Sequence, residues 1–201
     1  MIWKMGERLE KMDEDAWRLE QCPAVFLTDS RNSRRVLDLS GIQYENDIQL
    51  GQIGFCKLET QQECLVGTLC IPKLLDVLGS RYRIYFFINQ NHVVLVDDED
   101  FSMRLIRRIK SKKAHQGETK ERFIYNYIAE FMSRDQELLM QYEKTLMHME
   151  EDAMQGKIEN FQQELMPIRR KLLNLRSYYD EMMDMGRELE ENENGFFAKK
   201  Q

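Results

Sequence analysis

The sequence predicts an α+β fold: a mostly antiparallel sheet of about five or more strands flanked by short helices, followed by a long antiparallel helical hairpin. Residues 1–113 contain short apolar runs rich in β-branched and aromatic residues, which turn residues separate. Residues 118–191 carry apolar side chains at steps of three and four, the period of a helix that buries one face. Gly156 interrupts this pattern and favours a turn between two antiparallel helices.

The first predicted strand is residues 24–28 (AVFLT), an uninterrupted apolar run. Asp29 or Ser30 then offers a side-chain cap for a short helix that ends near Gly41. The sequence therefore places one short helix directly after a buried strand.

The next elements are predicted as a hairpin and a helical turn. Residues 53–59 and 63–72 form the hairpin arms, joined through the polar TQQ. Pro72 ends the second arm, and residues 73–79 (KLLDVLG) are interpreted as a helical turn closed by Gly79. The elements up to this point mix strands and short helices, as expected for an α+β domain.

A second hairpin and a helix complete the first half. Residues 82–88 and 92–97 are rich in aromatic and β-branched residues, and NQN between them suits a tight turn. The acidic run DDED follows, and then the helix FSMRLIRRIKSKK. Its carboxylates, at Asp97, Asp98 and Asp100, have two interpretations: they cap the helix, or they bind a hydrated divalent cation.

The second half predicts two helices of roughly 50 Å each. Asp135 occupies a position on the first helix where its period calls for an apolar residue. Pro167 lies inside the second helix and is expected to bend it. From Lys157 onward the apolar stripe follows an unbroken heptad, made of Ile158, Phe161, Leu165, Ile168, Leu172, Leu175, Tyr179, Met182, Gly186 and Leu189.

These patterns divide the chain into residues 1–113 (sheet), 114–195 (helical hairpin) and 196–201 (the start of a truncated connection). The apolar GFF at residues 195–197 is expected to have nothing to pack against here, which suggests that the polypeptide continues. No apolar run reaches the length of a membrane span, so this chain is expected to be soluble and cytoplasmic.

Composition argues against two classes of function. The net charge of -6 and pI near 5.3 argue against a nucleic-acid binder. The three histidines fall in a turn, a linker and a helix face, so no nucleophile has an evident base and no enzyme is predicted. The four cysteines, Cys22, Cys56, Cys64 and Cys70, have no metal or disulfide spacing and are interpreted as reduced core residues.

The stretches RFIYNYIAEFMSRDQELLMQYEKTLMHMEEDAMQG and LMPIRRKLLNLRSYYDEMMDMGRELEENENGFF resemble the cytoplasmic domain of CorA-like divalent-cation transporters. An aspartate followed by spaced leucines, a late ME before a glycine turn, and a proline-arginine pair on the second helix carry the resemblance. FFINQNHVVLVDDEDFSMRLIRRI is similar to the family's last strand pair and the helix after it. The family's two membrane helices and its Gly-Met-Asn motif have no match in this chain.

The resemblance implies a homo-oligomer, a pentamer in the full-length protein, attached to the inner or plasma membrane through C-terminal helices outside this chain. It implies that magnesium or another divalent cation is the transported and regulatory ion, with no organic cofactor. Carboxylates between subunits would sense the cation and favour the closed pore. The candidate metal ligands are Asp97, Asp98, Asp100, Asp180 and Asp184.

The alternative hypothesis is a cytosolic helical-hairpin interaction module unconnected to membranes. It rests on the heptad stripe and on more methionines than one helical seam can bury. It predicts a defined protein partner and no effect of divalent cations on assembly or melting.

Overall fold

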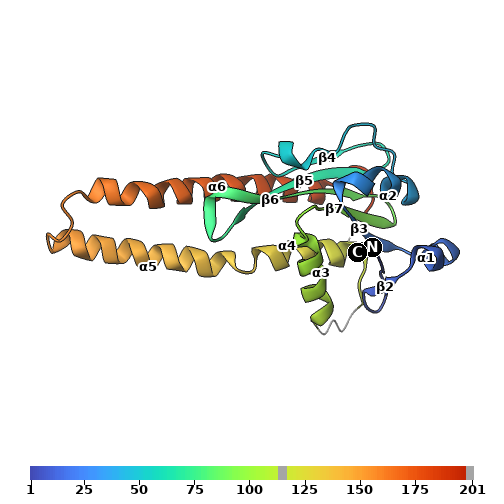
Figure 1. The fold of residues 1–201 in the computed structure, drawn as a ribbon, viewed down its shortest axis with the longest axis horizontal. Helices are drawn as coiled ribbons and strands as arrows, with labels where there is room; N and C mark the ends of the chain where they lie inside the picture. Colours follow the sequence, from blue (N-terminus) through green and yellow to red (C-terminus); the bar gives the residue numbers. More distant parts are fainter. Residues whose placement is uncertain (113–116, 198–201) are drawn as a thin grey trace.

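The computed structural model describes residues 1–112 and 117–197. It confirms the α+β architecture, with a seven-stranded sheet in the order β2-β1-β3-β7-β6-β5-β4. Figure 1 shows helices on both sides of this sheet and two long helices, α5 and α6, extending beyond it. The predicted boundary between residues 113 and 114 lies outside the described residues, as do residues 198–201.

The seven strands are joined mainly by antiparallel pairing. Their bounds are Ile2–Lys4 (β1), Glu10–Met12 (β2), Ala24–Thr28 (β3), Lys57–Thr60 (β4), Leu65–Lys73 (β5), Asp76–Ile88 (β6) and His92–Val96 (β7). The pair β3 and β7 is the parallel exception, with Phe26 opposite Val94. The predicted strands at residues 24–28, 82–88 and 92–97 are therefore confirmed, and their hairpin through NQN is the β6–β7 connection.

The predicted helical turn at residues 73–79 is wrong. Lys73 pairs with Asp76 across a tight turn, so β5 and β6 form one long hairpin. Leu75 at the tip is fully exposed, whereas Val77 is buried. The leucines at the tip imitate a helical pattern, but the extended pairing of β5 with β6 determines the local structure. In the hairpin predicted from residues 53–59 and 63–72, the first strand, β4, begins at Lys57 rather than at residue 53.

In the described part of the chain, six α-helices surround or extend from the sheet. Their bounds are Glu14–Glu20 (α1), Ser33–Leu39 (α2), Phe101–Ser111 (α3), Lys120–Met132 (α4), Asp135–Met154 (α5) and Phe161–Glu191 (α6). A short 3-10 turn, η1 (Ser30–Asn32), precedes α2, and the Asp29 side chain accepts a hydrogen bond from the Asn32 amide. The predicted cap is thus confirmed at Asp29. A second 3-10 turn, η2, spans Leu50–Gln52. Among the described residues, no helix is both long and apolar enough to cross a bilayer.

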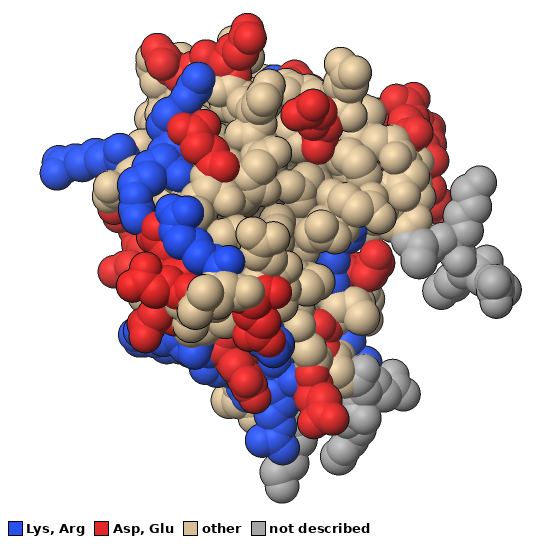
Figure 2. Space-filling view, turned by 90° about the vertical axis from the view of Figure 1, so that its right-hand side faces the viewer, with Lys and Arg blue, Asp and Glu red and all other residues tan. Residues whose placement is uncertain are grey.

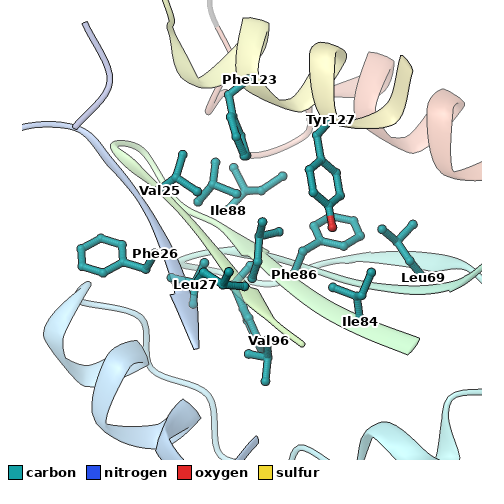
Figure 3. Packing of buried hydrophobic residues seen from close by; sticks show 14 of the residues in the cluster. Val25, Phe26, Leu27, Leu69, Ile84, Phe86, Ile88, Val96, Phe123 and Tyr127 are labelled. Atoms are coloured by element: carbon teal, nitrogen blue, oxygen red, sulfur yellow. The ribbon is translucent and has the colours of Figure 1, made fainter. Parts of the chain in front are cut away.

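The sheet is buried on both faces. Phe123 and Tyr127 of α4 point onto one face, where Figure 3 shows them above Ile88 and Phe86. On the opposite face, Phe26 packs edge to face against Trp17 of α1, with ring centroids 5.1 Å apart. This two-sided burial explains why strands β3 and β7 are continuous apolar runs without alternation.

Gly67 of β5 makes one of these packing layers possible. It lies opposite Phe86 of β6, whose ring covers the glycine. A Cβ atom at residue 67 would meet the Phe86 ring at 2.0 Å, so any larger residue displaces that ring.

The first arm of the predicted hairpin is two helices rather than one. Helix α4 ends at Met132, and α5 begins at Asp135, the residue that interrupts the apolar period. The second arm begins at Phe161 rather than Lys157, after Gly156 with φ of +68°. At 1.5 Å per residue, α6 is roughly 46 Å long and α5 roughly 30 Å. Helix α6 continues through Pro167.

The base of α6 joins the sheet core, whereas the outer part of the hairpin extends beyond it (Figure 1). Leu175, Tyr178, Met182 and Met185 are buried, and the heptad positions before residue 175 are only half-buried. The expectation that the GFF at residues 195–197 lacks a packing partner is wrong. Phe196 and Phe197 are partly buried against the same core.

Candidate functional site

The acidic run at residues 97–100 connects β7 to α3. Asp97 is buried, and its carboxylate accepts hydrogen bonds from two backbone amides, Glu99 N at 2.8 Å and Ser102 N at 2.5 Å. The Ser102 amide lies in the first turn of α3, where the N–H groups have no partner within the helix, and the Glu99 amide lies in the turn just before it. Asp97 therefore caps α3, the first of the two roles considered for the acidic run.

Asp98 and Asp100 are both exposed, but only Asp98 accepts hydrogen bonds from another segment of the described chain. Asp98 accepts hydrogen bonds from the amide and the hydroxyl of Ser30, both at 2.8 Å. Asp100 has a left-handed backbone, with φ of 56°, and its side chain makes no capping hydrogen bond. Part of the turn is thus held to η1, while the Asp100 carboxylate faces solvent.

This turn gathers more acidic residues than the sequence pattern alone predicts. Strands β3 and β7 are parallel neighbours, so their carboxyl ends meet at one edge of the sheet. Asp29 follows β3 there, as Asp97 follows β7. Hydrogen bonds from the Asn32 side chain and amide lower the pKa of Asp29. The signal for this juxtaposition would have been two acidic residues, each directly after a buried strand.

Asp180 and Asp184 lie one turn apart on α6, and both are exposed. Asp180 is 3.9 Å from the Arg176 guanidinium, and Asp184 is 2.9 Å from that of Arg187. In residues 1–112 and 117–197, no hydrogen bond or ion pair joins them to the acidic turn. Within those residues, no group of three or more Asp, Glu, His or Cys side chains is arranged to hold a metal ion.

The interrupting residue Asp135 belongs to a buried polar cluster that the sequence did not predict. Asp135 is 9% exposed, and burial raises the pKa of its carboxyl group. The nearby Tyr179 hydroxyl favours the charged form of Asp135, although the two do not meet the geometry of a hydrogen bond. The Tyr178 and Tyr179 hydroxyls are buried and have no hydrogen-bond partner among the described residues, and burial raises the pKa of both.

Through hydrogen bonds, Lys120 links the start of α4 to two distant segments. Its Nζ atom donates to the carbonyl oxygens of Asn89, Gln90 and Phe196 at 3.2, 2.7 and 2.5 Å. The same atom lies 5.3 Å from the centre of the Phe197 ring, within range of a cation–π interaction. Burial lowers the pKa of Lys120. Nothing in the local sequence distinguishes this lysine from an exposed one.

Three groups with potential nucleophilic or basic chemistry, His92, Cys56 and Cys64, are buried in the core. Burial lowers the pKa of His92 to about 4, and its Nδ1 accepts a hydrogen bond from Ala24 N at 3.2 Å. Burial raises the pKa of Cys56 to about 12 and that of Cys64 to about 11. The histidine is thus neutral and these thiols are protonated at neutral pH. All four cysteines are free; Cys56, Cys64 and Cys70 are core residues, as predicted, whereas Cys22 is only half-buried.

The charged surface at the opposite end from the hairpin tip has no single sign. Figure 2 shows Lys and Arg side chains gathered toward one side of this end, with Asp and Glu among them. The middle of the same face is largely uncharged.

Two kinds of comparison place the chain among known proteins. The model of the CorA-like Mg²⁺ transporter protein family matches residues 44–201. No curated protein sequence matches the chain. The soluble domain of CorA from Methanocaldococcus jannaschii has a similar structure, with a TM-score of 0.65 and 16% identity over 92% of this chain and 77% of that one.

The full-length CmaX protein is also similar in structure, with a TM-score of 0.53 and 16% identity. The match covers 69% of this chain and 43% of the CmaX chain, so this chain corresponds to less than half of that protein. At such identities the structural matches show the fold, and the family model shows the relationship. The chain belongs to the family of CorA-like Mg²⁺ transporter proteins.

Proposed function

We propose that this chain is the cytoplasmic regulatory and assembly domain of a CorA-like magnesium transporter. It binds cytosolic divalent cation and, through assembly into a homo-oligomer, favours the closed state of the pore. Transport itself belongs to membrane helices that follow this domain in the full-length protein, which assembles as a pentamer. The family match over residues 44–201 and the likeness to a soluble CorA domain support the proposal.

The distribution of carboxylates carries the sensing part of the proposal. Asp98 and Asp100 lie at the acidic turn and Asp180 and Asp184 on the outside of α6, all exposed. Neither pair is accompanied by a third ligand in the described residues. Mg²⁺ keeps several waters and needs only one or two carboxylates from each partner. Two incomplete sites suit an ion shared between neighbouring copies.

A shared ion stabilises only the arrangement that brings both copies together, so it shifts the population toward that state. Asp97, the remaining candidate, is buried and has both carboxylate oxygens engaged by backbone amides. Asp98, whose oxygens accept from Ser30, and Asp100 are exposed and can be reached by a hydrated ion. We therefore assign Asp97 the positioning of the turn, and Asp98 and Asp100 the contact with the hydrated ion.

The test is a Mg²⁺ titration followed by thermal melting. At a concentration about 100 times the dissociation constant, binding adds about 2.7 kcal/mol to the free energy of unfolding. For a chain of this size that raises Tm by roughly 5 to 11 °C. The paired substitutions Asp98→Asn with Asp100→Asn, and Asp180→Asn with Asp184→Asn, are each expected to reduce the shift.

The matched control neutralises Asp38 and Asp47, which are exposed and lie in other parts of the molecule. It removes the same charge and should keep the full Mg²⁺ shift. The absence of any shift at millimolar Mg²⁺ would argue against sensing by this domain. If the control lost as much of the Mg²⁺ shift in Tm as the paired variants, the shift would be explained by general charge screening rather than by a binding site.

The competing function is an interaction module without a membrane partner. The observation that favours it is the exposure of Met140, Met147, Met154 and Met183 on the hairpin, because methionine suits adaptable partner surfaces. Reading the gene beyond Gln201 separates the two. Two apolar segments of about 20 residues, the first followed by Gly-Met-Asn, support the transporter, and their absence supports the module.

A further inference from the structure

The outward face of α5 carries an exposed apolar stripe. Met140, Met147 and Met154 recur every seven residues, so they lie on one side of the helix. They are 57%, 56% and 90% exposed. The half-buried positions of the same helix, Leu138, Tyr142, Leu146 and Met149, fall on the opposite side. We call the three methionines the α5 outer stripe.

The outer half of α6 has a corresponding stripe. Met166 and Leu173 are also seven residues apart, and they are 43% and 54% exposed. The half-buried heptad positions Phe161, Leu165, Ile168 and Leu172 lie on another side of the helix. Met166 and Leu173 form the α6 outer stripe. In each arm of the hairpin, one side of the helix therefore faces the other arm of the same chain, and an exposed apolar stripe lies on a different side.

The two outer stripes are bordered by opposite charges. The sequence of α5 contains six acidic residues and one lysine, and Glu143 and Glu150 flank its stripe. Residues 161–176 of α6 contain four basic residues and one glutamate, and Arg169 and Arg170 flank its stripe. None of these four flanking residues forms a salt bridge within the described part of the chain. Unpaired charges of opposite sign thus border two exposed apolar stripes.

We propose that the α5 outer stripe of one copy packs against the α6 outer stripe of the next copy. This inference rests on the self-assembly in the proposed function and names the contact that builds it. Methionines and leucine bury one another at the centre of the contact, and Glu143 and Glu150 face Arg169 and Arg170 at its border. The arrangement resembles the apolar seam and flanking charges of a coiled coil.

The charges favour contact between unlike arms, so that α5 of one copy meets α6 of another. Pairing α5 with α5 across a two-fold axis would bring glutamates against glutamates, and pairing α6 with α6 would bring arginines together. Like charges in such positions are unfavourable. Pairing α5 with α6 satisfies both arms, and because it uses two different surfaces it is a head-to-tail contact that can close into a ring.

A cross-linking experiment tests which arms meet. One copy carries Met147→Cys and the other Met166→Cys, positions at similar distances from the turn between the arms. Under mild oxidation the mixture is expected to form a mixed disulfide faster than either variant forms a disulfide with itself. Faster formation of the Met147→Cys homodimer would overturn the proposal. The unsubstituted chain, treated in the same way, controls for the native cysteines.

Charge reversal tests the energetics by sedimentation velocity over a range of concentrations. The α5 variant carries Glu143→Arg and Glu150→Arg, and the α6 variant carries Arg169→Glu and Arg170→Glu. Each alone is expected to raise the concentration of half-assembly by at least about tenfold. A chain with all four substitutions restores opposite charges and is expected to assemble again. The control reverses Glu45 and Glu63, which are exposed and lie outside the hairpin.

The outcomes separate this inference from the proposed function. Unchanged assembly in both arm variants, or a wild-type chain that stays monomeric and uncross-linked at all concentrations, overturns the arm-to-arm contact. Unchanged assembly in both arm variants leaves the Mg²⁺ shift in Tm in place, because that shift depends on the carboxylates, whereas absence of the shift counts against the proposed function. Circular dichroism at 222 nm checks that each variant keeps its helices, so loss of assembly cannot be mistaken for unfolding.

Discussion

Replacing Asp97 by alanine tests whether the acidic turn is held by hydrogen bonds or by an ion. The substitution leaves two backbone amides, those of Glu99 and Ser102, without the acceptors that lie 2.8 and 2.5 Å away. Loss of a helix cap typically costs about 1 kcal/mol, and loss of a hydrogen bond to a charged group costs about 1.5 to 3 kcal/mol. Because the Ser102 side is buried and the Glu99 side is nearer to water, we expect a total loss of about 2 to 3 kcal/mol.

For a chain of this size, that loss lowers Tm by roughly 4 to 12 °C. Urea unfolding gives the free energy directly, and melting gives Tm, each in EDTA and in millimolar Mg²⁺. The cap is made of protein groups alone, so the loss should be the same in both buffers. Asp97→Asn keeps one acceptor oxygen and should show an intermediate loss.

Asp100→Asn is the matched control, since it removes the same charge from the same turn. Asp100 makes no capping bond, and asparagine tolerates its left-handed backbone. In EDTA, a change below about 0.5 kcal/mol in the free energy of unfolding is expected. A loss for Asp97→Ala that appeared only with Mg²⁺ present would refute the capping argument and make Asp97 a metal ligand.

Three further predictions follow from buried groups. The lowered pKa of His92 means that the unfolded chain binds the proton more tightly, so stability should fall as pH decreases from about 6.5 to about 4. His92→Gln should flatten that dependence in urea titrations at several pH values, and an unchanged slope would contradict it. Gly67→Ala should cost about 1 to 3 kcal/mol because the new Cβ meets the Phe86 ring, whereas Gly54→Ala has open space and should cost far less. Burial raises the pKa of Asp135 in the folded chain. Its stabilising contribution to the free energy of unfolding is therefore fully present below the pKa of the unfolded chain, and it is lost as the pH rises through the pKa of the folded chain. Asp135→Asn should therefore remove that decline and stabilise the chain at pH 7, and a destabilised variant at pH 7 would show that the charge is compensated.

Local patterns predicted those elements whose burial repeats along the chain. The heptad stripe predicted α6, and the two β-branched runs around NQN predicted β6 and β7 with their turn. The same reasoning failed at residues 73–79, where neighbouring leucines imitate a helix but one of them, Leu75, lies exposed at a hairpin tip. Strands β1 and β2 have only three residues each, too few to show any period.

The candidate site was predictable only in part. The sequence indicated an acidic turn before a helix and an aspartate out of place at position 135. It could not show that Asp98 holds Ser30, a residue 68 positions away, or that Tyr178 and Tyr179 lie near Asp135. These contacts depend on how distant segments meet, and no local period encodes them.

The sequence by itself determined the α+β class, the long helical hairpin and the family resemblance, because side-chain periodicity and turn residues act within a few positions of one another. The tertiary structure decided the parallel pairing of β3 with β7, the break between α4 and α5, and the roles of individual carboxylates. It also decided that Lys120 holds the segment after α6 and that two outer stripes remain exposed. The physical reason is that hydrogen bonding and desolvation depend on neighbours in space, and distant parts of the chain supply those neighbours.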